Sequence, residues 1–336
     1  METIEGVGSM GISNDFSEGI DGNISFSSSS WKFSEHLQTP PATTPGYTRL
    51  TIPQGNSTPH VVIGLLTPQI LENLSPWQPH FILRNKNLEF TPKNPEKRTE
   101  IFHEILLDWK EKGLFHLDKT WRGENFEIKP GSHYTSDSTP PLFTLDRSAT
   151  PLFGLRQFGV HVNGFVRKPS GLSLWLQKRS GNREMWPGFF DNLVGGGLST
   201  KNTIITTATK ESSEEASIPS DYLMENLKPA GAVSFFYESN YGLFPNTEFV
   251  FDLELSEDFE PSNNDGEVEG FVLVTVEEAM EIVKSSKFKT TSCPVILDFL
   301  VRHGFINSFN EPQLPQLLPL LHMPLDMFYT SNHGNY

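Results

Sequence analysis

The segment FFDNLVGGGLSTKNTIITTATKESSEEASI, residues 189–218, joins a strand-like run to three glycines and a polar stretch. FFDNLV has the aromatic and apolar residues of a short strand and leads straight into the glycines Gly195, Gly196 and Gly197. Three glutamates follow at spacings of three and four residues: Glu211, Glu214 and Glu215. On a helix these positions share one face, and carboxylates are the oxygen ligands that Mg²⁺ prefers. The segment therefore poses a choice between a solvated acidic helix face and a metal site.

The stretch TIITTATKESSEEAS is a poor helix by composition, because threonine, isoleucine and serine dominate it. A strand over residues 203–209 is the competing interpretation. Two features favour a helix: Asn202 or Thr203 can cap it, and a weakly apolar stripe runs along it. The stripe consists of Ile205, Ala208 and Ser212. On such a helix the three like charges repel one another unless a cation lies between them.

A basic segment precedes the glycines. QKRSGNR places Lys178, Arg179 and Arg183 together in an otherwise acidic protein. Basic side chains beside a carboxylate–metal cluster suit a diphosphate, and glycine lets backbone approach a ligand and lend its carbonyl to a metal. The alternative interpretation is a solubilising basic loop beside a solvated acidic face.

The 336-residue chain has a formal net charge of −15 and one cysteine, Cys293. The charge argues against nucleic acid and anionic membranes, so the expected partner is a small molecule, bound by a monomer or a homodimer. A lone thiol forms no internal disulfide, and Cys293 lies in an apolar stretch typical of a core helix. No apolar run is long enough for a bilayer, and the N-terminus lacks the pattern of a signal or transit peptide. A cytoplasmic protein is expected.

Composition divides the chain into four segments. Residues 1–45 are rich in Ser, Gly, Asn, Thr and Pro and are expected to be disordered. Residues 46–148 surround the helical pattern EKRTEIFHEILLDWKEKG with strand-like runs and predict a small α+β domain. Residues 149–310 form the main domain, and residues 311–336 form a proline-broken apolar tail expected to pack on the surface.

The main domain mixes strands and helices. KPSG between FGVHVNGFVR and LSLWLQKR predicts a hairpin. Further strands are expected in AGAVSFFYE, TEFVFDLEL and GFVLVTV, and further helices in VEEAMEIVKSS and CPVILDFLVRHG. This order predicts an α+β fold in which helices cover a mixed sheet, as in an α/β/α sandwich.

At this point the residues resemble the Nudix hydrolases, whose box reads G-x5-E-x7-R-E-U-x-E-E-x-G-U, where U is aliphatic. Lys210 and Glu211 align with the R-E pair, which places Gly196 on the first glycine and Ile218 on the last aliphatic position. Glu214 and Glu215 take the paired glutamates. The sequence departs from the box at four positions, where it has Asn202 for Glu, Lys210 for Arg, Ser212 for an aliphatic residue and Ser217 for Gly.

A wider resemblance covers roughly residues 55–310. PLFTLDRSATPLFGLRQFGVHVNGFV, KRSGNREMWPGFFDNLVGGGL, DFEPSNNDGEVEGFVLV and VILDFLVRHGFI look like the thiamine pyrophosphokinase-related Nudix branch. KGLFHLDKTWRGENFEI looks like part of the extra N-terminal domain of that branch. The resemblance implies hydrolysis of thiamine diphosphate and of damaged forms, such as oxothiamine and oxythiamine diphosphates, to the monophosphate. It also implies Mg²⁺, with Mn²⁺ as a substitute, and clearance of damaged cofactor as the biological role.

The resemblance further implies a role for each matching residue. Glu214 and Glu215 would bind Mg²⁺ with the Gly195 carbonyl, Glu211 would bind metal or orient the attacking water, and Lys210 would position the neighbouring glutamate. A later acidic residue often serves as ligand or base, and Glu267 is favoured over Asp265 and Glu269. Phosphate contacts are expected from Lys178, Arg179 and Arg183. Candidates for holding the substrate ring are Trp186, Phe189, Phe190 and Asp191.

Three alternatives remain open. An isopentenyl diphosphate isomerase shares the fold but needs a catalytic cysteine near the early strands, whereas Cys293 lies far downstream. Hydrolysis of another nucleoside diphosphate derivative is the second. The third is a Nudix fold kept as a binding or interaction module, against which the retained glutamates argue, because a decayed site would lose such carboxylates first.

Overall fold

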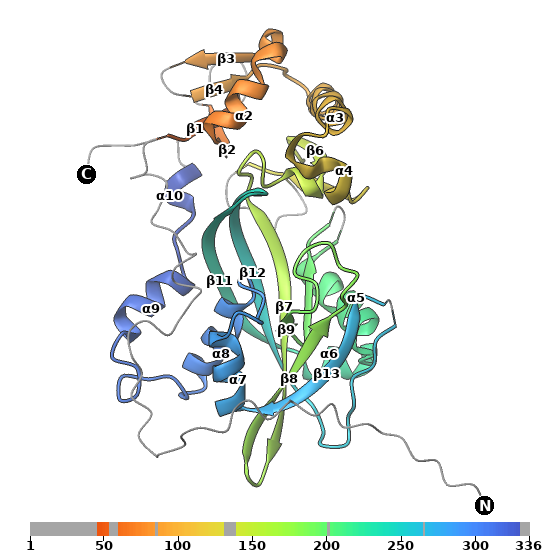
Figure 1. The fold of residues 1–336 in the computed structure, drawn as a ribbon, viewed down its shortest axis with the longest axis vertical. Helices are drawn as coiled ribbons and strands as arrows, with labels where there is room; N and C mark the ends of the chain where they lie inside the picture. The colour runs from red at the N-terminus through yellow and green to blue at the C-terminus, as the bar shows by residue number, and fades with distance from the viewer. Residues whose placement is uncertain are drawn as a thin grey trace, which may run out of the picture.

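The computed structural model of the protein describes residues 46–53, 60–84, 87–130, 139–199, 202–264 and 266–329. The predicted disorder of residues 1–45 lies outside these ranges. Figure 1 shows a smaller part, built from the first strands and helices, seated at one end of a longer and strongly twisted sheet.

The smaller part holds a four-stranded sheet in the order β2-β1-β4-β3 and a two-stranded sheet of β5 and β6. Its strands are β1 Thr48–Ile52, β2 Val61–Leu66, β3 Phe81–Arg84, β4 Asn87–Phe90, β5 Asn125–Ile128 and β6 Phe143–Asp146. Its helices are α2 Pro68–Asn73, α3 Pro95–Glu111 and α4 Leu117–Thr120, with 3₁₀ turns η1 Ser75–His80, η2 Leu114–His116 and η3 Arg147–Ala149.

Helix α3 forms where the apolar spacing predicts it. Asn94 caps it by accepting from the Lys97 N–H at 2.7 Å, and Pro95 takes the first turn, where its missing N–H costs nothing. Gly113 follows the helix at φ +66°, a left-handed conformation that glycine adopts without strain. The apolar side chains of one α3 face lie in the core of this part: Ile101, Phe102, Ile105, Leu106 and Trp109.

The longer sheet has seven strands, in the order β11-β12-β7-β8-β13, with β10 paired to β7 and β9 paired to β8. The strands are β7 Gln157–Lys168, β8 Gly171–Arg179, β9 Phe190–Asn192, β10 Val194–Gly197, β11 Lys228–Ser239, β12 Gly242–Glu254 and β13 Val268–Thr275. Lys168 pairs with Gly171, so the hairpin predicted at KPSG is confirmed. β12 runs parallel to β7 while the other pairings are antiparallel, which makes the sheet mixed.

Helices cover both faces of this sheet (Figure 1). α5 Ile204–Ala216 and α6 Ser220–Asn226 pack on one face, and α7 Val276–Lys284 and α8 Cys293–Arg302 on the other. Because strand side chains alternate, Val160 and Val162 lie under α5 and α6, while Phe165 lies under α8. The predicted α+β fold, an α/β/α sandwich with a mixed sheet, is confirmed.

Two further expectations concern helices. Cys293 is buried at the start of α8, and burial raises the pKa of its thiol, as befits a core residue rather than a nucleophile. Within the described part of the chain, no helix has both the length and the apolar character needed to cross a membrane.

The single strand expected for FFDNLV is wrong in detail. The chain forms two short strands instead, β9 and β10, which meet at the buried Leu193. β9 pairs with β8 and β10 pairs with β7, so the break lets the chain pass from one neighbour to the other. The three glycines therefore lie within a strand rather than in the loop after one.

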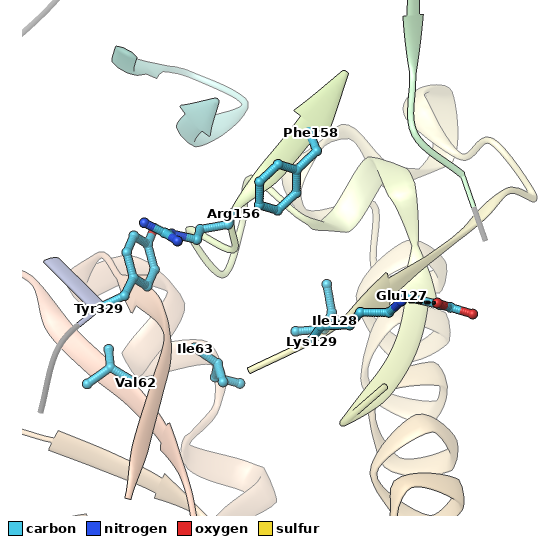
Figure 2. A pocket seen from close by; sticks show the side chains of 8 residues that line it. All are labelled: Val62, Ile63, Glu127, Ile128, Lys129, Arg156, Phe158 and Tyr329. Carbon is cyan, nitrogen blue, oxygen red and sulfur yellow. Dashed lines mark ion pairs between the residues drawn. The ribbon is translucent and has the colours of Figure 1, made fainter. Parts of the chain in front are cut away.

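The C-terminal tail packs on both parts. α9 Leu314–Leu321 lies against β11, and α10 Asp326–Tyr329 lies against β2. Figure 2 shows the Arg156 side chain beside the Tyr329 ring, where the guanidinium lies 4.8 Å from the ring centroid and also pairs with Asp326 at 2.6 Å. Arg156 and Tyr329 border a cavity of about 20 Å³, the size of one water. The predicted segment boundaries at 45, 148 and 310 stay predictions.

An ion-pair cluster joins α8 to the sheet. Arg302 donates to both oxygens of Asp252, at 2.7 and 3.0 Å, while Asn163 donates at 3.1 Å and His303 lies 3.1 Å away. Burial raises the pKa of Asp252, but the bonds from Arg302, His303 and Asn163 outweigh it and leave that pKa below its usual range.

We expect Asp252→Asn to lower the free energy of unfolding by about 2–3 kcal/mol at pH 7, because it removes the carboxylate that accepts two bonds from Arg302 and leaves that arginine paired with Asp298 alone among the described residues. Since the folded pKa is depressed, this stabilisation is present above the unfolded pKa of about 3.9 and is lost as the pH falls through the folded value. Urea unfolding between pH 3 and 7 measures both effects. Glu254→Gln, on the same strand in an exposed pair with Arg167, is the control and should cost below about 1 kcal/mol. Equal losses for the two variants would contradict the assignment.

Candidate functional site

Helix α5 begins with a reciprocal cap that offsets its weak composition. The Thr203 hydroxyl accepts from the Thr206 N–H at 3.2 Å, and the Thr206 hydroxyl accepts from the Thr203 N–H at 2.8 Å. The helix interpretation is confirmed, and the competing strand over residues 203–209 is not observed. One detail of the predicted stripe is wrong: Ala208 and Ser212 are buried, but Ile205 is exposed.

The glycines of β10 bring α5 close to the sheet. A Cβ placed on Gly196 would lie 2.3 Å from Cγ of Glu211, so a side chain there would displace the glutamate. Small buried residues on the helix, Ala208 and Ser212, allow the same close approach from the other side. Glu211 therefore lies directly over Gly196.

Glu215 is the buried member of the group. Its Oε2 accepts from the Gly195 N–H at 3.0 Å and from the Gln177 amide at 3.3 Å. Burial raises the pKa of Glu215 to about 8, because the Gly195 N–H only partly offsets the loss of solvent. Among the described residues, no lysine, arginine or histidine pairs with Glu215, and a cation bound beside this carboxyl would favour its ionised form.

The Gly195 backbone faces the same place as Glu215. Its N–H points away from the neighbouring strand β7 and towards the carboxyl. In an antiparallel ladder the N–H and C=O of one residue point to the same side, so the Gly195 carbonyl is also directed away from β7. A backbone oxygen and a buried carboxylate therefore share one edge of the strand.

Lys210 holds the two more exposed glutamates. Its Nζ lies 3.0 Å from Glu214 and 3.4 Å from Glu211. The hydrogen bond to Glu214 raises the pKa of Lys210, and burial raises the pKa of Glu211. Among the described residues, no three His, Cys, Asp or Glu side chains already surround a common point. The donor set nevertheless fits a hard divalent cation, because carboxylate and carbonyl oxygens are its preferred ligands.

The end of α5 has the shape that the family box requires, although a serine stands there. Ser217 has φ +55° and ψ +32°, a left-handed conformation that usually favours glycine. Its hydroxyl donates to the Ser262 carbonyl at 2.6 Å, which ties the helix end to the loop before β13. Asn264 adds two bonds, from its N–H to the Glu214 carbonyl and from its amide to the Ser213 carbonyl.

This loop leads to the predicted acidic residues. Glu267 forms an ion pair with Arg183, and its charge helps to raise the pKa of Glu215. Glu269 instead pairs with Lys178 at 2.7 Å. Asp265 lies outside the described residues. Of Glu267 and Glu269, Glu267 is the one whose charge acts on Glu215.

Two of the predicted phosphate-binding residues, Lys178 and Arg179, are not brought together. Lys178 and Arg179 are successive strand residues and point to opposite faces. Arg179 is buried and donates to Asp191 at 3.2 Å and to the carbonyls of Met185 and Trp186. Lys289 pairs with the same Asp191 at 2.9 Å. These bonds occupy Arg179 and Asp191 with each other rather than leaving them open to a ligand.

The predicted aromatic wall is compact. Trp186 adopts φ +57° in the loop before β9 and meets Phe189 edge-on, with ring centroids 5.2 Å apart. Phe190 belongs to β9 and packs with the α7–α8 core. The Trp186 and Phe189 rings therefore lie next to each other, beside the loop that carries Arg183.

Sequence reasoning missed residues that contact the glycines from elsewhere in the chain. The His161 ring lies against Gly195, and Glu248 lies against Gly159, which pairs with Gly197. His161 is 3.8 Å from Glu248, but burial lowers its pKa, so this contact joins a neutral imidazole to a carboxylate. A lone histidine within the apolar run FGVHVNGF was the one available signal. Arg147, over Gly197, gave none.

Neither described cavity is lined by the residues of this site. The one in Figure 2 lies where β2, β5, β7 and α10 meet. A larger cleft of about 470 Å³ lies between α3 and the β5–β6 sheet. The candidate site at β10 and α5 is therefore identified by its carboxylate and backbone groups and not by a large cavity.

We expect Asp191→Asn to lower the free energy of unfolding by about 3–5 kcal/mol, because it leaves Arg179 and Lys289 buried without a counter-charge. Guanidinium unfolding monitored by circular dichroism measures the loss. Glu281→Gln removes the partly exposed pair with Lys284 and should change stability by less than about 1 kcal/mol. A neutral effect of Asp191→Asn would mean that this carboxylate is not a structural counter-ion.

Two family models match the chain. Residues 57–157 match a domain of unknown function (DUF4743), and residues 157–292 match the NUDIX domain. The chain is similar to Nudix hydrolase 20, chloroplastic, of Arabidopsis thaliana, with 38% identity over 215 residues, or 64% of this chain and 55% of that protein. It is also similar to Nudix hydrolase 24, chloroplastic, of the same plant, with 36% identity over 67% of this chain and 59% of that protein.

A third relative is an uncharacterized protein of Saccharomyces cerevisiae, 33% identical over 62% of each chain. The chain thus spans between 55% and 62% of these relatives' own lengths. The matched Nudix model contains β10 and α5, the two elements that carry the glycines and the glutamates. Residues 157–292 of the chain are therefore a Nudix domain.

Proposed function

We propose that this protein hydrolyses the diphosphate bond of a small molecule with a divalent cation, Mg²⁺ or Mn²⁺. The observation that carries the proposal is Glu215, a buried carboxyl that has hydrogen-bond donors but no cation, beside the Gly195 backbone. A buried carboxyl without a counter-charge lowers the stability of the fold. Carboxyls with strongly shifted pKa values concentrate at reactive sites, which is a reason to place the chemistry at Glu215. The Nudix domain that contains it supports the same chemistry.

The residues divide the work as follows. Glu215, Glu214 and the Gly195 carbonyl would hold the cation, and Glu211 would bind it or orient the attacking water. A bound divalent cation supplies charge neutralisation for the diphosphate oxygens and lowers the pKa of water. Lys210 lies within 3.4 Å of both Glu211 and Glu214 and would keep their orientation. Glu267, near Glu215, would be a further ligand or base.

We further propose thiamine diphosphate and its damaged oxothiamine and oxythiamine analogues as substrates, with the monophosphate and phosphate as products. The sequence resemblance to the thiamine pyrophosphokinase-related branch supports this choice. Trp186 and Phe189 would supply an aromatic surface for a heterocycle. The net charge of −15 opposes nucleic acid as partner. A cytoplasmic location and a monomeric or dimeric state stay predictions of the sequence.

Two observations favour a second candidate, a Nudix domain that binds a ligand without cleaving it. Lys210 already pairs with both Glu211 and Glu214, and Asn202 stands where the family box has a glutamate. In such a module the lysine would replace the metal. The two candidates differ in whether a divalent cation changes the reaction of a diphosphate, which a direct assay decides.

The deciding experiment measures product formation from thiamine diphosphate and oxothiamine diphosphate, with Mg²⁺ and with EDTA, beside ADP-ribose, NADH and dinucleotides. We expect a thiamine monophosphate to appear only with the cation. Cleavage of a nucleotide alone would keep the hydrolase and reject the thiamine substrate. No cleavage of any compound by the folded protein would favour the binding module.

We expect Glu215→Gln to slow metal-dependent turnover about 100-fold or more, the scale on which loss of one electrostatic group slows a reaction. The fold should survive, because the glutamine carbonyl can still accept from Gly195 and Gln177. Steady-state rates and a thermal unfolding curve test the two halves. Glu277→Gln, an exposed change on α7, should alter neither. Unchanged turnover in Glu215→Gln would remove this mechanism from consideration.

A further inference from the structure

The N-terminal part of the chain reaches the glycine strand through Arg147. This residue opens η3, directly after β6. A Cβ placed on Gly197 would lie 2.6 Å from the Arg147 guanidinium, so the arginine rests on the strand backbone. Gly196, the next residue back, carries Glu211 on the opposite face of the strand. A cation from one part of the chain and a carboxylate from the other thus contact successive residues of β10.

Asp146 holds a second arginine, Arg122, near Arg147. The buried Asp146 carboxylate accepts from the Gly123 N–H at 2.8 Å and from the Ser148 N–H at 2.9 Å. It also lies 3.4 Å from the Arg122 N–H. One carboxylate therefore joins the turn that carries Arg122 to the turn that carries Arg147. Asp146 acts as a positioning residue for both arginines.

The Arg147 side chain is held in a defined place. Its guanidinium lies 5.3 Å from the centre of the Phe126 ring and 3.1 Å from Glu124. The pair with Glu124 is well exposed, with side chains 41% and 37% accessible, and such pairs contribute little stability. An incoming anion can therefore replace Glu124 at small cost while Phe126 keeps the guanidinium in position.

Three arginines meet in this region. Arg122 lies close enough to Arg147 and Arg183 that, after burial, their charges lower its pKa further, and it also feels the charges of Glu184 and Glu267. Arg183 pairs with Glu267. Within the described residues, Arg122 has no ion-pair partner of its own. Three guanidinium groups drawn from residues 122–183 thus lie beside the carboxylates Glu124, Glu184 and Glu267, which an incoming diphosphate would replace as their partner.

We propose that Arg122 and Arg147, with Arg183, bind the diphosphate group of the substrate beside the α5 glutamates, so that the N-terminal part completes the Nudix site. Guanidinium forks match phosphate oxygens in geometry as well as in charge. The arginines take the place that Lys178 and Arg179 do not fill, because those two residues are paired elsewhere. This inference rests on the proposed function and assigns a role to the matched domain of unknown function.

The test is calorimetric titration of inorganic pyrophosphate into the full-length protein in EDTA. We expect Arg122→Ala and Arg147→Ala each to weaken binding about tenfold, the effect of losing one charge-assisted contact. Arg147→Lys keeps the charge and loses the fork, so a smaller loss is expected. Arg167→Ala is the matched control, because Arg167 forms a similarly exposed pair with Glu254 on the distant half of β7. Thermal unfolding curves check that each variant is folded. If an alanine variant is unfolded, the lysine variant at the same position is titrated in its place.

Each outcome bears on the inference. It is overturned if the wild type shows no pyrophosphate binding at millimolar concentration. It is equally overturned if the double variant of Arg122 and Arg147 binds within twofold of Arg167→Ala. Hydrolysis of thiamine diphosphate, measured separately, distinguishes the two proposals. Pyrophosphate binding that depends on the arginines, without hydrolysis of thiamine diphosphate, would retain this inference and reject the proposed function. Hydrolysis at the wild-type rate by the double variant of Arg122 and Arg147 would retain the proposed function and reject this inference.

Discussion

The whole candidate site depends on the close approach of helix α5 to the three glycines of strand β10. Gly195, Gly196 and Gly197 present bare backbone on both faces of β10. Glu211 fills the space over Gly196, and the His161 ring and the Arg147 guanidinium fill the spaces over its two neighbours. A Cβ on any of the three glycines would meet one of these groups at less than 3 Å. The glycines thus bring acidic and basic side chains from three separate regions onto one short strand.

Two buried carboxyls near this strand show how the environment decides charge. Asp191 is surrounded by Arg179 and Lys289, which outweigh the cost of burial and keep its pKa far below the usual range. Glu215 is equally buried but has only amide donors, and its pKa rises to about 8. The first is a counter-ion that is already satisfied. The second is a buried carboxyl whose bonds come from the Gly195 N–H and the Gln177 amide, and we propose the chemistry there.

The departures from the family box have local compensations. Ser217 adopts the left-handed conformation of the usual glycine and is held by Ser262. Lys210 reaches Glu211 and Glu214 as an arginine would, although with one point of charge instead of a fork. Ser212 is fully buried where an aliphatic side chain is usual, which suits the tight contact between α5 and β10. These positions can therefore change while the helix keeps its place.

The sequence by itself determined the mixed α and β architecture, the hairpin at KPSG, the helix over residues 96–111 and the glutamate face of α5. These follow from periodicity, turns and caps, which act over a few residues. Only the tertiary structure decided that FFDNLVGGG forms two strands, that Arg179 and Asp191 satisfy each other, and that Arg147 lies over Gly197. Each of these depends on which distant segment becomes the neighbour. The local sequence pattern does not predict these neighbours, because strand pairing and the burial of charges depend on contacts between residues that are far apart in the sequence.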